Sequence, residues 1–284
     1  MDAKTWALVT ALSFGTVPVV LKMAFQRGGQ AGIGIIISLV VAIPLNIAIG
    51  LFVDPHYERL TPLAIVAFAL GGLAGSAVGR YWNYVSVDLL GASRSATIRN
   101  ASPVFTALLA MVLYQEAITP VRWAAILAIV VGAGLVSWTP GSGRRGWVSL
   151  GVLYALGAAL SYGFRPIFIK YGLEQADVPL AASIIGAFAA LAYTVIREPR
   201  GNYRKTKVDG AFWFFLLAGV LQTVAQLALA LGLSGGDVSL VYSLTASAPL
   251  FTLLFSAILL RGVEKITLQL LAGCVAVVIG VIYL

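Results

Sequence analysis

Three arginines lie inside apolar segments of the sequence and are the residues best suited to bind a ligand: Arg80, Arg99 and Arg165. All eleven Asp and Glu residues, in contrast, fall in predicted loops or at the ends of apolar segments. A charge inside a membrane is costly, and such residues usually face the interior of a helix bundle or a water-filled cavity. Because a guanidinium group can hold a carboxylate or phosphate by two parallel hydrogen bonds, the pattern predicts a binding site for an anion.

The sequence around two of these arginines predicts irregular helices. Asn100 follows Arg99 directly, with a proline shortly after it, and Arg165 stands immediately before Pro166. Proline frees a backbone carbonyl and can kink a helix around a site. We expect Arg80 and Arg99 at a similar depth, roughly 8 Å from one membrane face, and Arg165 at a similar depth from the other face. Alternatively, these arginines reach the nearer surface or bind freed carbonyls, which would make them structural.

Other polar residues repeat at helical spacing and can line the same cavity. Asn83 lies three residues after Arg80, and Gln222 and Gln226 are four residues apart. Tyr242 lies on a helix face that leads to a proline. The alternative is that such side chains join neighbouring helices by hydrogen bonds without touching a ligand. The predicted substrate-binding set is Arg80, Asn83, Arg99, Asn100, Arg165, Gln222, Gln226 and Tyr242.

The composition predicts that these residues sit in a membrane protein. Hydrophobic residues make up 60% of the 284 residues and charged residues only 11%, against about 25% in soluble domains, and the mean hydropathy is +0.95. One cysteine, Cys274, and one histidine, His56, argue against a metal site, and neither paired acids nor a P-loop motif is present. We therefore expect no enzyme, no cofactor and no nucleic-acid partner. The expected partners are the lipid bilayer and a small-molecule substrate.

Ten apolar segments approach the length of about 20 residues that a helix needs to cross a bilayer. Most are joined by short loops bounded by charged residues, prolines or glycines. The predicted spans are 5–25, 32–53, 62–85, 94–114, 121–138, 148–170, 179–196, 211–233, 238–260 and 267–284.

The two halves of the sequence repeat each other. Residues 12–15, Leu-Ser-Phe-Gly, recur as Leu-Ser-Tyr-Gly at 160–163, an offset of 148, and the proline-containing segment 101–106 recurs at 247–252. Each half holds five predicted spans, and because five is odd the halves must cross the membrane in opposite senses. Such inverted repeats place a binding site at their interface near the bilayer midplane. The predicted fold is an all-α membrane protein of ten transmembrane helices in two inverted five-helix repeats, 1–138 and 148–284, with a linker at 139–147.

The interior arginines are not repeated in the other half of the sequence. Their approximate partners in the other half are Leu227 for Arg80, Thr245 for Arg99 and Val17 for Arg165. Packing that both halves share therefore does not require the charges, which favours a role in substrate binding. Because one chain carries both halves, and hence a whole pathway, we expect a monomer to suffice.

Prolines, acids and glycines recur at matching places in the two halves. The fourth and ninth spans each contain a proline and end at an acid, and the fifth and tenth are punctuated by glycine; these residues are Pro103, Pro249, Glu116, Glu264, Gly132 and Gly280. The pattern resembles the drug/metabolite transporter superfamily and, within it, the ten-span proteins built from two EamA-type repeats. The resemblance covers the whole chain, although the second half is two residues longer before its acid. It implies a secondary carrier of small metabolites that works by exchange or proton coupling.

This resemblance and the interior arginines together predict a secondary transporter that moves a small metabolite by alternating access. The favoured substrate is an organic anion, or a metabolite that carries a carboxylate or phosphate. Two alternatives stay open. One is an exporter of amino acids or other neutral metabolites, and the other is a protein that binds or translocates a phosphorylated lipid through a groove open to the bilayer.

The two faces of the predicted bundle differ in charge, which bears on orientation in the cell membrane. Eleven basic residues fall on the face opposite the termini: Arg27, Arg94, Arg144, Arg145, Arg197, Arg200, Arg204, Lys205, Lys207, Arg261 and Lys265. Four fall on the face of the termini: Lys4, Arg59, Arg122 and Lys170. The positive-inside rule therefore favours termini outside the cell, whereas the resemblance implies termini in the cytoplasm.

Overall fold

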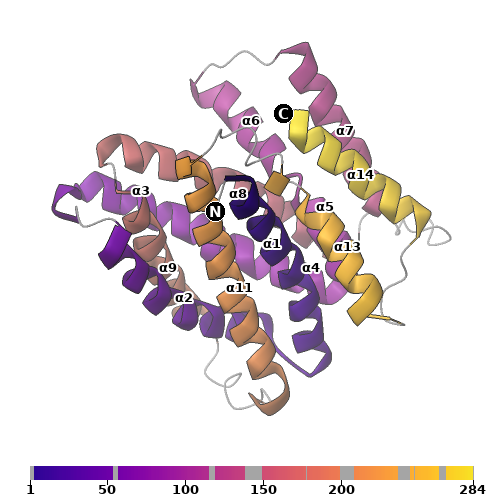
Figure 1. Ribbon diagram of the computed structural model, residues 1–284, viewed down its shortest axis with the longest axis horizontal. Coiled ribbons are helices and arrows are strands. Elements are labelled where there is room, and N and C mark those ends of the chain that lie inside the picture. The colour runs from indigo at the N-terminus through magenta and orange to yellow at the C-terminus, as the bar shows by residue number, and fades with distance from the viewer. Residues whose placement is uncertain are drawn as a thin grey trace.

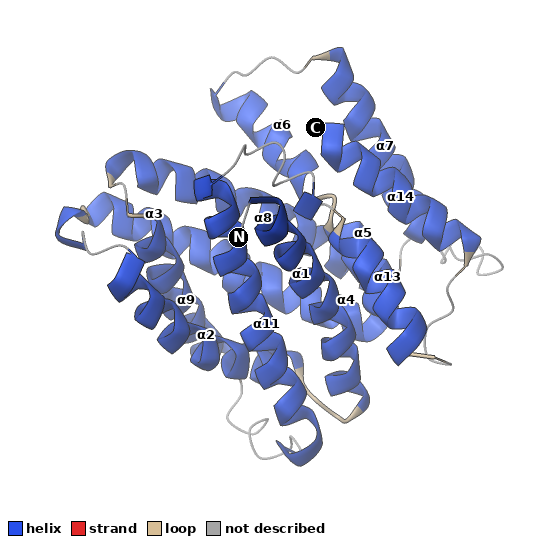
Figure 2. Ribbon diagram, viewed as in Figure 1, coloured by secondary structure: helices blue, strands red, loops and turns tan. Residues whose placement is uncertain are grey.

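The structure is built from helices. The computed structural model describes residues 3–53, 57–114, 119–137, 149–176, 178–198, 208–235, 244–245, 247–261 and 267–283. Within these ranges the chain forms helices joined by short connections and contains no β-strand (Figure 2). Tyr242, Glu116, Glu264 and the predicted linker 139–147 lie outside the described residues.

The described residues of the first half form seven α-helices, a 3-10 turn and a π-helix. In chain order they are α1 (Ala3–Gln26), α2 (Ala31–Val53), η1 (Tyr57–Arg59), α3 (Pro62–Gly72), the π-helix η2 (Leu73–Gly79), α4 (Arg80–Leu90), α5 (Ala92–Arg99), α6 (Ser102–Tyr114) and α7 (Pro120–Ser137). Local sequence explains several of these boundaries. The Thr61 side chain caps α3 by accepting from the Ala64 N–H at 3.2 Å. Gly91, with a φ of 93° that favours glycine, separates α4 from α5.

The described residues of the second half follow the same order, and its eighth span forms one α-helix without the π-helical segment found in the third. Its described helices are α8 (Leu150–Gln175), α9 (Pro179–Arg197), α11 (Val208–Gly235), α13 (Ala248–Leu259) and α14 (Leu268–Tyr283). Seven helical segments of the described residues are long and apolar enough to cross a membrane, and three shorter apolar helices, Pro120–Val136, Ala248–Leu259 and Leu268–Tyr283, accompany them. The predicted all-α membrane fold is therefore confirmed, while the count of ten spans stays a prediction.

The third predicted span is longer and less regular than expected. From Pro62 to Leu90 the chain is one continuous helical segment whose middle, Leu73–Gly79, is π-helical. Arg80 consequently lies ten residues before the end of this segment, about 15 Å in at 1.5 Å per residue. Arg165 also lies ten residues before the end of its helix, at Gln175. Both helices thus continue further beyond the arginines than the predicted spans did, and the depth of the arginines below the membrane face stays a prediction.

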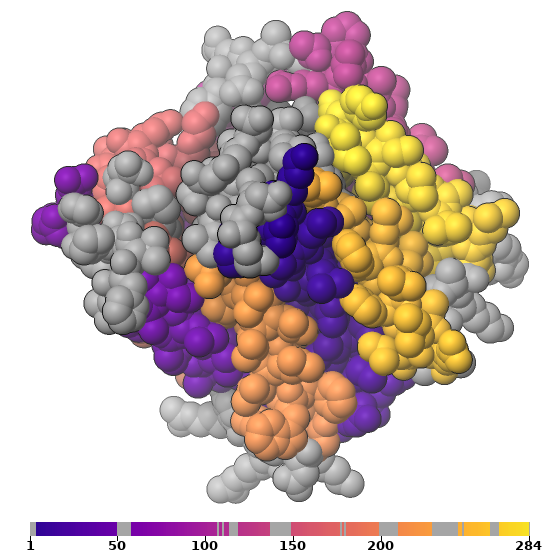
Figure 3. Space-filling view, viewed as in Figure 1, coloured from indigo at the N-terminus to yellow at the C-terminus, as the bar shows by residue number. Residues whose placement is uncertain are grey.

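The two halves pack against each other through two equivalent sets of contacts, one around α1 and one around α8. Helix α1 packs between α11 and α13 of the second half, as Figure 3 shows on the visible face, and α8 packs in the same way against the α3–α4 and α5–α6 segments of the first half. Helices α7 and α14 lie side by side at one end of the bundle (Figure 1). Each half thus inserts its first helix between the third and fourth spans of the other.

Two glycines show this reciprocal packing at atomic detail. A Cβ on Gly15 would lie 2.6 Å from the carbonyl oxygen of Ala248, and a Cβ on Gly163 would lie 2.6 Å from the Cβ of Phe105. The hydroxyl of Thr252 donates to the Gly15 carbonyl at 2.8 Å, and the hydroxyl of Thr106 donates to the Gly163 carbonyl at 3.1 Å. The close approach of backbones is what small residues allow between membrane helices.

The π-helix accounts for a shift of register between the repeats. Gly72 packs on Gly186 and Gly219 packs on Ser38, which makes Gly72 and Gly219 partners at an offset of 147. Beyond the π-helix, the packing of the two halves at Ser102 and Ala248 corresponds to an offset of 146. A π-turn holds one residue more than an α-turn, so the first half takes up its extra residue in η2. The structural partner of Arg80 is therefore Gln226 rather than Leu227.

Candidate functional site

A cavity of about 290 Å³ lies between the two halves. Seven of the eight predicted binding residues line it, and the eighth, Tyr242, is outside the described residues. The predicted residues in the lining are Arg80, Asn83, Arg99, Asn100, Arg165, Gln222 and Gln226. The remaining lining residues are Phe14, Val17, Gly75, Ser102, Pro103, Tyr162, Pro166, Thr245, Ala248 and Val281. Sequence reasoning therefore brought together side chains from distant spans, although their contact with a substrate stays a prediction.

The cavity lies on the pseudo-two-fold axis that relates the repeats. Five pairs of partner positions each contribute both members to its lining: Phe14 and Tyr162, Val17 and Arg165, Arg80 and Gln226, Arg99 and Thr245, and Ser102 and Ala248. In three of these pairs an arginine faces a neutral residue. The cavity is consequently symmetric in its backbone and asymmetric in its charge.

Arg80 is held at one side of the cavity by a hydrogen-bonded network. Its side chain is only 6% exposed, and its Nη1 donates to the Ser38 hydroxyl at 3.4 Å. The Ser38 hydroxyl lies 3.3 Å from the hydroxyl of Tyr84, which also accepts from Nε2 of Gln222 at 3.3 Å. Ser38 and Tyr84 themselves do not line the cavity. They connect two lining residues, Arg80 and Gln222, through the buried core behind them.

Arg165 is placed beside the π-helix that precedes Arg80. A Cβ on Gly75 would lie 2.4 Å from Cδ of Arg165, so the absence of a side chain at Gly75 makes room for the stem of this arginine. Gly75 accepts the backbone N–H of Arg80, which places both residues one turn apart in the same segment. The Ser161 hydroxyl donates to the Ala74 carbonyl at 3.0 Å and fastens the π-helix to α8. Arg80 and Arg165 therefore belong to the same side of the cavity.

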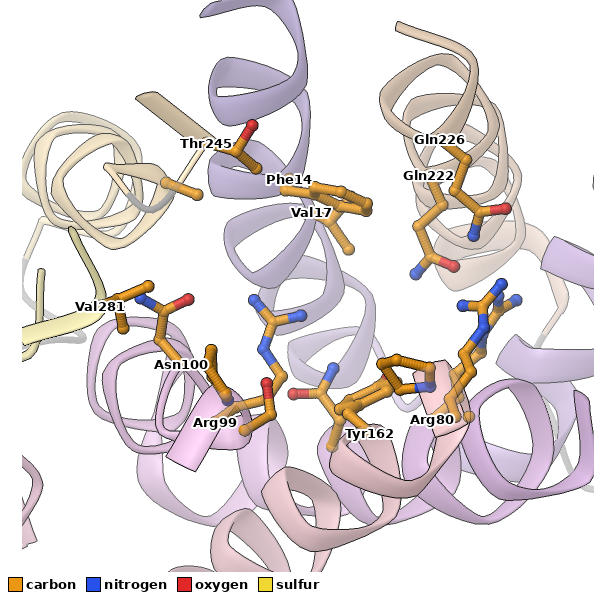
Figure 4. Close-up of a pocket in the computed structure, with 17 residues that line it drawn as sticks. Phe14, Val17, Arg80, Arg99, Asn100, Tyr162, Gln222, Gln226, Thr245 and Val281 are labelled. Carbon is orange, nitrogen blue, oxygen red and sulfur yellow. The ribbon is translucent and has the colours of Figure 1, made fainter. Parts of the chain in front are cut away.

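Arg99 enters the cavity from the other side, where the fourth span is broken. Helix α5 ends at Arg99, and α6 begins at Ser102. Figure 4 shows Arg99 and Arg80 reaching into the cavity from opposite sides, with Phe14 and Tyr162 on the other two sides. The guanidinium carbon of Arg99 lies 5.9 Å from the centre of the Tyr162 ring, within the range of a cation–π contact. The predicted irregularity of this helix is present at Arg99.

Two oxygen atoms in the lining are buried and have no hydrogen-bond partner. They are Oδ1 of Asn83, whose side chain is 3% exposed, and Oγ1 of Thr245. A buried polar atom left without a partner costs about 1–3 kcal/mol, so such atoms usually signal a missing ligand or water. Among the lining residues that the structure describes, three are arginines and none is Asp or Glu. The cavity therefore offers a positive field together with unused acceptors.

Several important residues were not singled out from sequence. Phe14 and Tyr162 stand in the repeated Leu-Ser-aromatic-Gly segments, so the repeat itself was a signal for them. Tyr84 stands four residues after Arg80, which is the spacing of one helix face and was a signal in the sequence. Ser38 carries no such signal, because a lone hydroxyl in an apolar helix is more often a packing residue, and only the fold shows that it adjoins Arg80.

Two contacts join neighbouring helices on the side of the cavity where α1 ends. There the Lys22 ammonium donates to the Asp88 carbonyl at 2.5 Å and joins the ends of α1 and α4. Val19, Ala92 and Leu260 pack in one fully buried cluster that joins α1, α5 and α13 below Arg99. In the opposite direction the lining extends to Val281, near the end of α14.

A helical membrane protein of two related halves, with a cavity on the axis between them, has an architecture that is common among membrane transporters. A family model described as the EamA-like transporter family matches residues 3–138 and again residues 149–284. The chain belongs to this EamA-like transporter family, as the sequence resemblance predicted.

Two further comparisons agree with this assignment. A riboflavin transporter of Rhizobium johnstonii (strain DSM 114642 / LMG 32736 / 3841) is 27% identical over 253 residues, which cover 83% of this chain and 76% of the relative. A protein of known crystal structure superposes with a TM-score of 0.64 at 18% sequence identity, covering 98% of this chain and 94% of that chain. The second similarity concerns the fold alone. The protein is therefore an integral membrane protein of a small-molecule transporter family.

Proposed function

We propose that the protein is a secondary carrier for a small organic anion, which binds between Arg99 on one side and Arg80 and Arg165 on the other. The observation that carries this proposal is the cavity between the repeats, which has three arginines and no acid among its described lining residues. A ligand carboxylate or phosphate would supply the missing negative charge. One chain holds the whole site, so a monomer suffices.

The described conformation supports movement by alternating access. Contacts join α1 to α4, α5 and the end of α13 on one side of the cavity, while on the other side its lining includes Val281 near the end of α14. Opening the first of these sides requires α1 to separate from α13 of the second half and also from α4 and α5 of its own half, so α1 has to move relative to the rest of the first repeat as the two halves rock. In this proposal the anion stays bound between the arginines while one side of the cavity closes and the other side opens.

Thermal unfolding of the purified protein in detergent tests the substrate class. We expect small carboxylates or phosphates to stabilise the wild type by about 2.7 kcal/mol at 100 times their dissociation constant. Arg99→Gln keeps the side chain polar but removes the charge, and it should abolish the stabilisation. Arg122→Gln is the matched control, because Arg122 is exposed in the first turn of α7, outside the cavity.

Uptake of the stabilising anion into liposomes then tests transport. We expect uptake by the wild type and by Arg122→Gln, and none by Arg99→Gln. The thermal unfolding assay serves as the control that all three proteins are folded. The proposal fails if anions stabilise Arg99→Gln as well as the wild type, or if only neutral and cationic compounds act.

A neutral heteroaromatic metabolite is the second candidate substrate. The observation in its favour is the similarity to a riboflavin transporter, at 27% identity. Carbonyl oxygens of such a compound can accept hydrogen bonds from the arginines without carrying a charge. Riboflavin therefore belongs in the same panel of compounds, and stabilisation by riboflavin with no response to anions would favour this second candidate.

A further inference from the structure

The cavity has two aromatic sides as well as two charged ones. Phe14 comes from α1 and Tyr162 from α8, and they are partners at an offset of 148 in the two repeats. Figure 4 shows them on facing sides of the cavity, across the direction that joins Arg99 to Arg80. An aromatic ring on each of two facing walls leaves a slot suited to a flat ring, because offset stacking is favourable on both of its faces.

The charged ends of this slot define what the flat ring must carry. Arg99 is at one end, and Arg80 with Arg165 is at the other, and a guanidinium group only donates hydrogen bonds. The ligand therefore needs acceptor groups at both ends of the ring. A carboxylate suits one end, and a second acid or a pair of ring carbonyls suits the other.

The unpartnered amide oxygen of Asn83 can accept a hydrogen bond, so it calls for a donor group on the ligand. Asn83 lies three residues after Arg80 on α4, and its Oδ1 is buried in the lining without a hydrogen-bond partner. The arginines can donate hydrogen bonds to a carbonyl of the ligand, but they cannot accept a hydrogen bond from an N–H of the ligand. A ring N–H beside a carbonyl would satisfy Asn83 and Arg80 at the same time.

We propose that the substrate of this carrier is a flat heteroaromatic acid, stacked between Phe14 and Tyr162, with acceptor groups at both ends and a ring N–H on Asn83. The proposal depends on the proposed function of the cavity as an anion site, and it narrows that site to one shape and one hydrogen-bonding pattern. Aliphatic anions of similar charge are expected to bind more weakly.

Orotate and dihydroorotate are the first pair of probes. Both carry the same carboxylate, carbonyls and N–H groups, but only orotate has a flat conjugated ring. By calorimetric titration of the full-length protein in detergent, we expect orotate to bind about tenfold more tightly, since stacking on two aromatic walls is lost with the flat ring. Equal affinities of the two compounds overturn the proposal.

A pair of phenylalanine variants locates the preference. Phe14→Leu should reduce the ratio of the two affinities to near one, because one wall of the slot is lost. Phe188→Leu is the matched control, since Phe188 is 50% exposed on α9 and does not line the cavity. Persistence of the tenfold preference in Phe14→Leu overturns the proposal.

Isophthalate, a flat ring with two carboxylates and no N–H, tests the role of Asn83. Asn83→Leu removes the acceptor while keeping a similar volume. We expect this variant to weaken orotate about tenfold and to leave isophthalate within a factor of about two, because only orotate donates a hydrogen bond at that place. Equal losses for both compounds overturn the assignment of the N–H to Asn83.

The same titrations separate this proposal from the proposed function. Glutarate is an aliphatic dianion without a ring. If it binds as tightly as orotate, and if this binding is lost in Arg99→Gln, the flat-ring proposal is overturned and the anion carrier is supported. If none of the acids binds, or if Arg99→Gln binds them all as well as the wild type, both proposals are overturned. Orotate bound most tightly, with the preference lost in Phe14→Leu and all binding lost in Arg99→Gln, supports both.

Discussion

Alanine at Gly15 or at Gly163 should loosen the same kind of contact between the two halves. A Cβ at Gly15 would meet the Ala248 carbonyl oxygen at 2.6 Å, and one at Gly163 would meet Phe105 Cβ at 2.6 Å and the Ser102 carbonyl oxygen at 3.2 Å. Most of these contacts are with backbone or Cβ atoms, which cannot rotate away as a flexible side chain does. The helices themselves must separate.

The expected loss of stability follows from these contacts. Overpacking of a filled interior costs about 1–3 kcal/mol, and the strained approach also weakens the hydrogen bond that Thr252 donates to Gly15, worth about 0.6 kcal/mol between membrane helices. The better helix propensity of alanine returns up to about 1 kcal/mol. We therefore expect a net loss of about 0.6–3.6 kcal/mol at Gly15, and a similar loss at Gly163.

Unfolding in mixed micelles of increasing denaturing-detergent content measures this loss. Gly134→Ala is the control, because no atom lies within 4 Å of a Cβ at Gly134, and it should leave stability unchanged or slightly raised. Comparable losses at Gly15 and Gly163 are required by the pseudo-two-fold packing. If one variant is as stable as the wild type while the other is strongly destabilised, the reciprocal interface described here is wrong.

Four further results are expected. Tyr84→Phe should raise KM several-fold and cost about 1–3 kcal/mol of stability, because two buried groups lose the hydroxyl between them; unchanged KM would show that the network does not position the site. Gly75→Ala should raise KM with little loss of stability, because its Cβ displaces only the flexible stem of Arg165. In a background with Cys274 replaced by serine, Ala92→Cys places a thiol at a fully buried position. Lys22→Met should increase maleimide labelling of this thiol, because it removes the hydrogen bond from Lys22 to the Asp88 carbonyl that joins α1 to α4. A reporter that is active only outside the cytoplasm should be active when fused to the C-terminus, as the charge bias predicts; activity of a cytoplasmic reporter there would contradict it.

Sequence alone was informative wherever a pattern is set by the bilayer or by the repeat. Apolar length located helices near every predicted span, and the offset of 148 located the reciprocal glycines at Gly15 and Gly163. The arginines were recognisable because an isolated charge in an apolar segment has few stable positions other than a polar cavity. That constraint explains why the three arginines, which stand on α4, α5 and α8, could be assigned to one lining.

What sequence could not supply is the local geometry of the third span. A π-helix has no reliable sequence signature, since it depends on which carbonyls tertiary contacts can satisfy. Here Ser161 of α8 satisfies the carbonyl of Ala74, and Gly72 and Gly75 allow α9 and the Arg165 stem to approach. The one-residue shift moved the partner of Arg80 from Leu227 to Gln226, which lines the cavity.

The division of labour between the repeats has a physical basis. Rocking of two halves requires interfaces that are alike on both sides, and the glycine and threonine contacts at Gly15 and Gly163 meet that requirement. Recognition of one substrate requires the opposite, because most small metabolites have two unlike ends. Within the cavity the two needs are met at different positions: backbone contacts obey the two-fold axis, while Arg99 and Arg165 face Thr245 and Val17 across it. A change that made Arg99 and Thr245 alike is therefore expected to alter which molecule binds and to leave the glycine contacts at Gly15 and Gly163 in place.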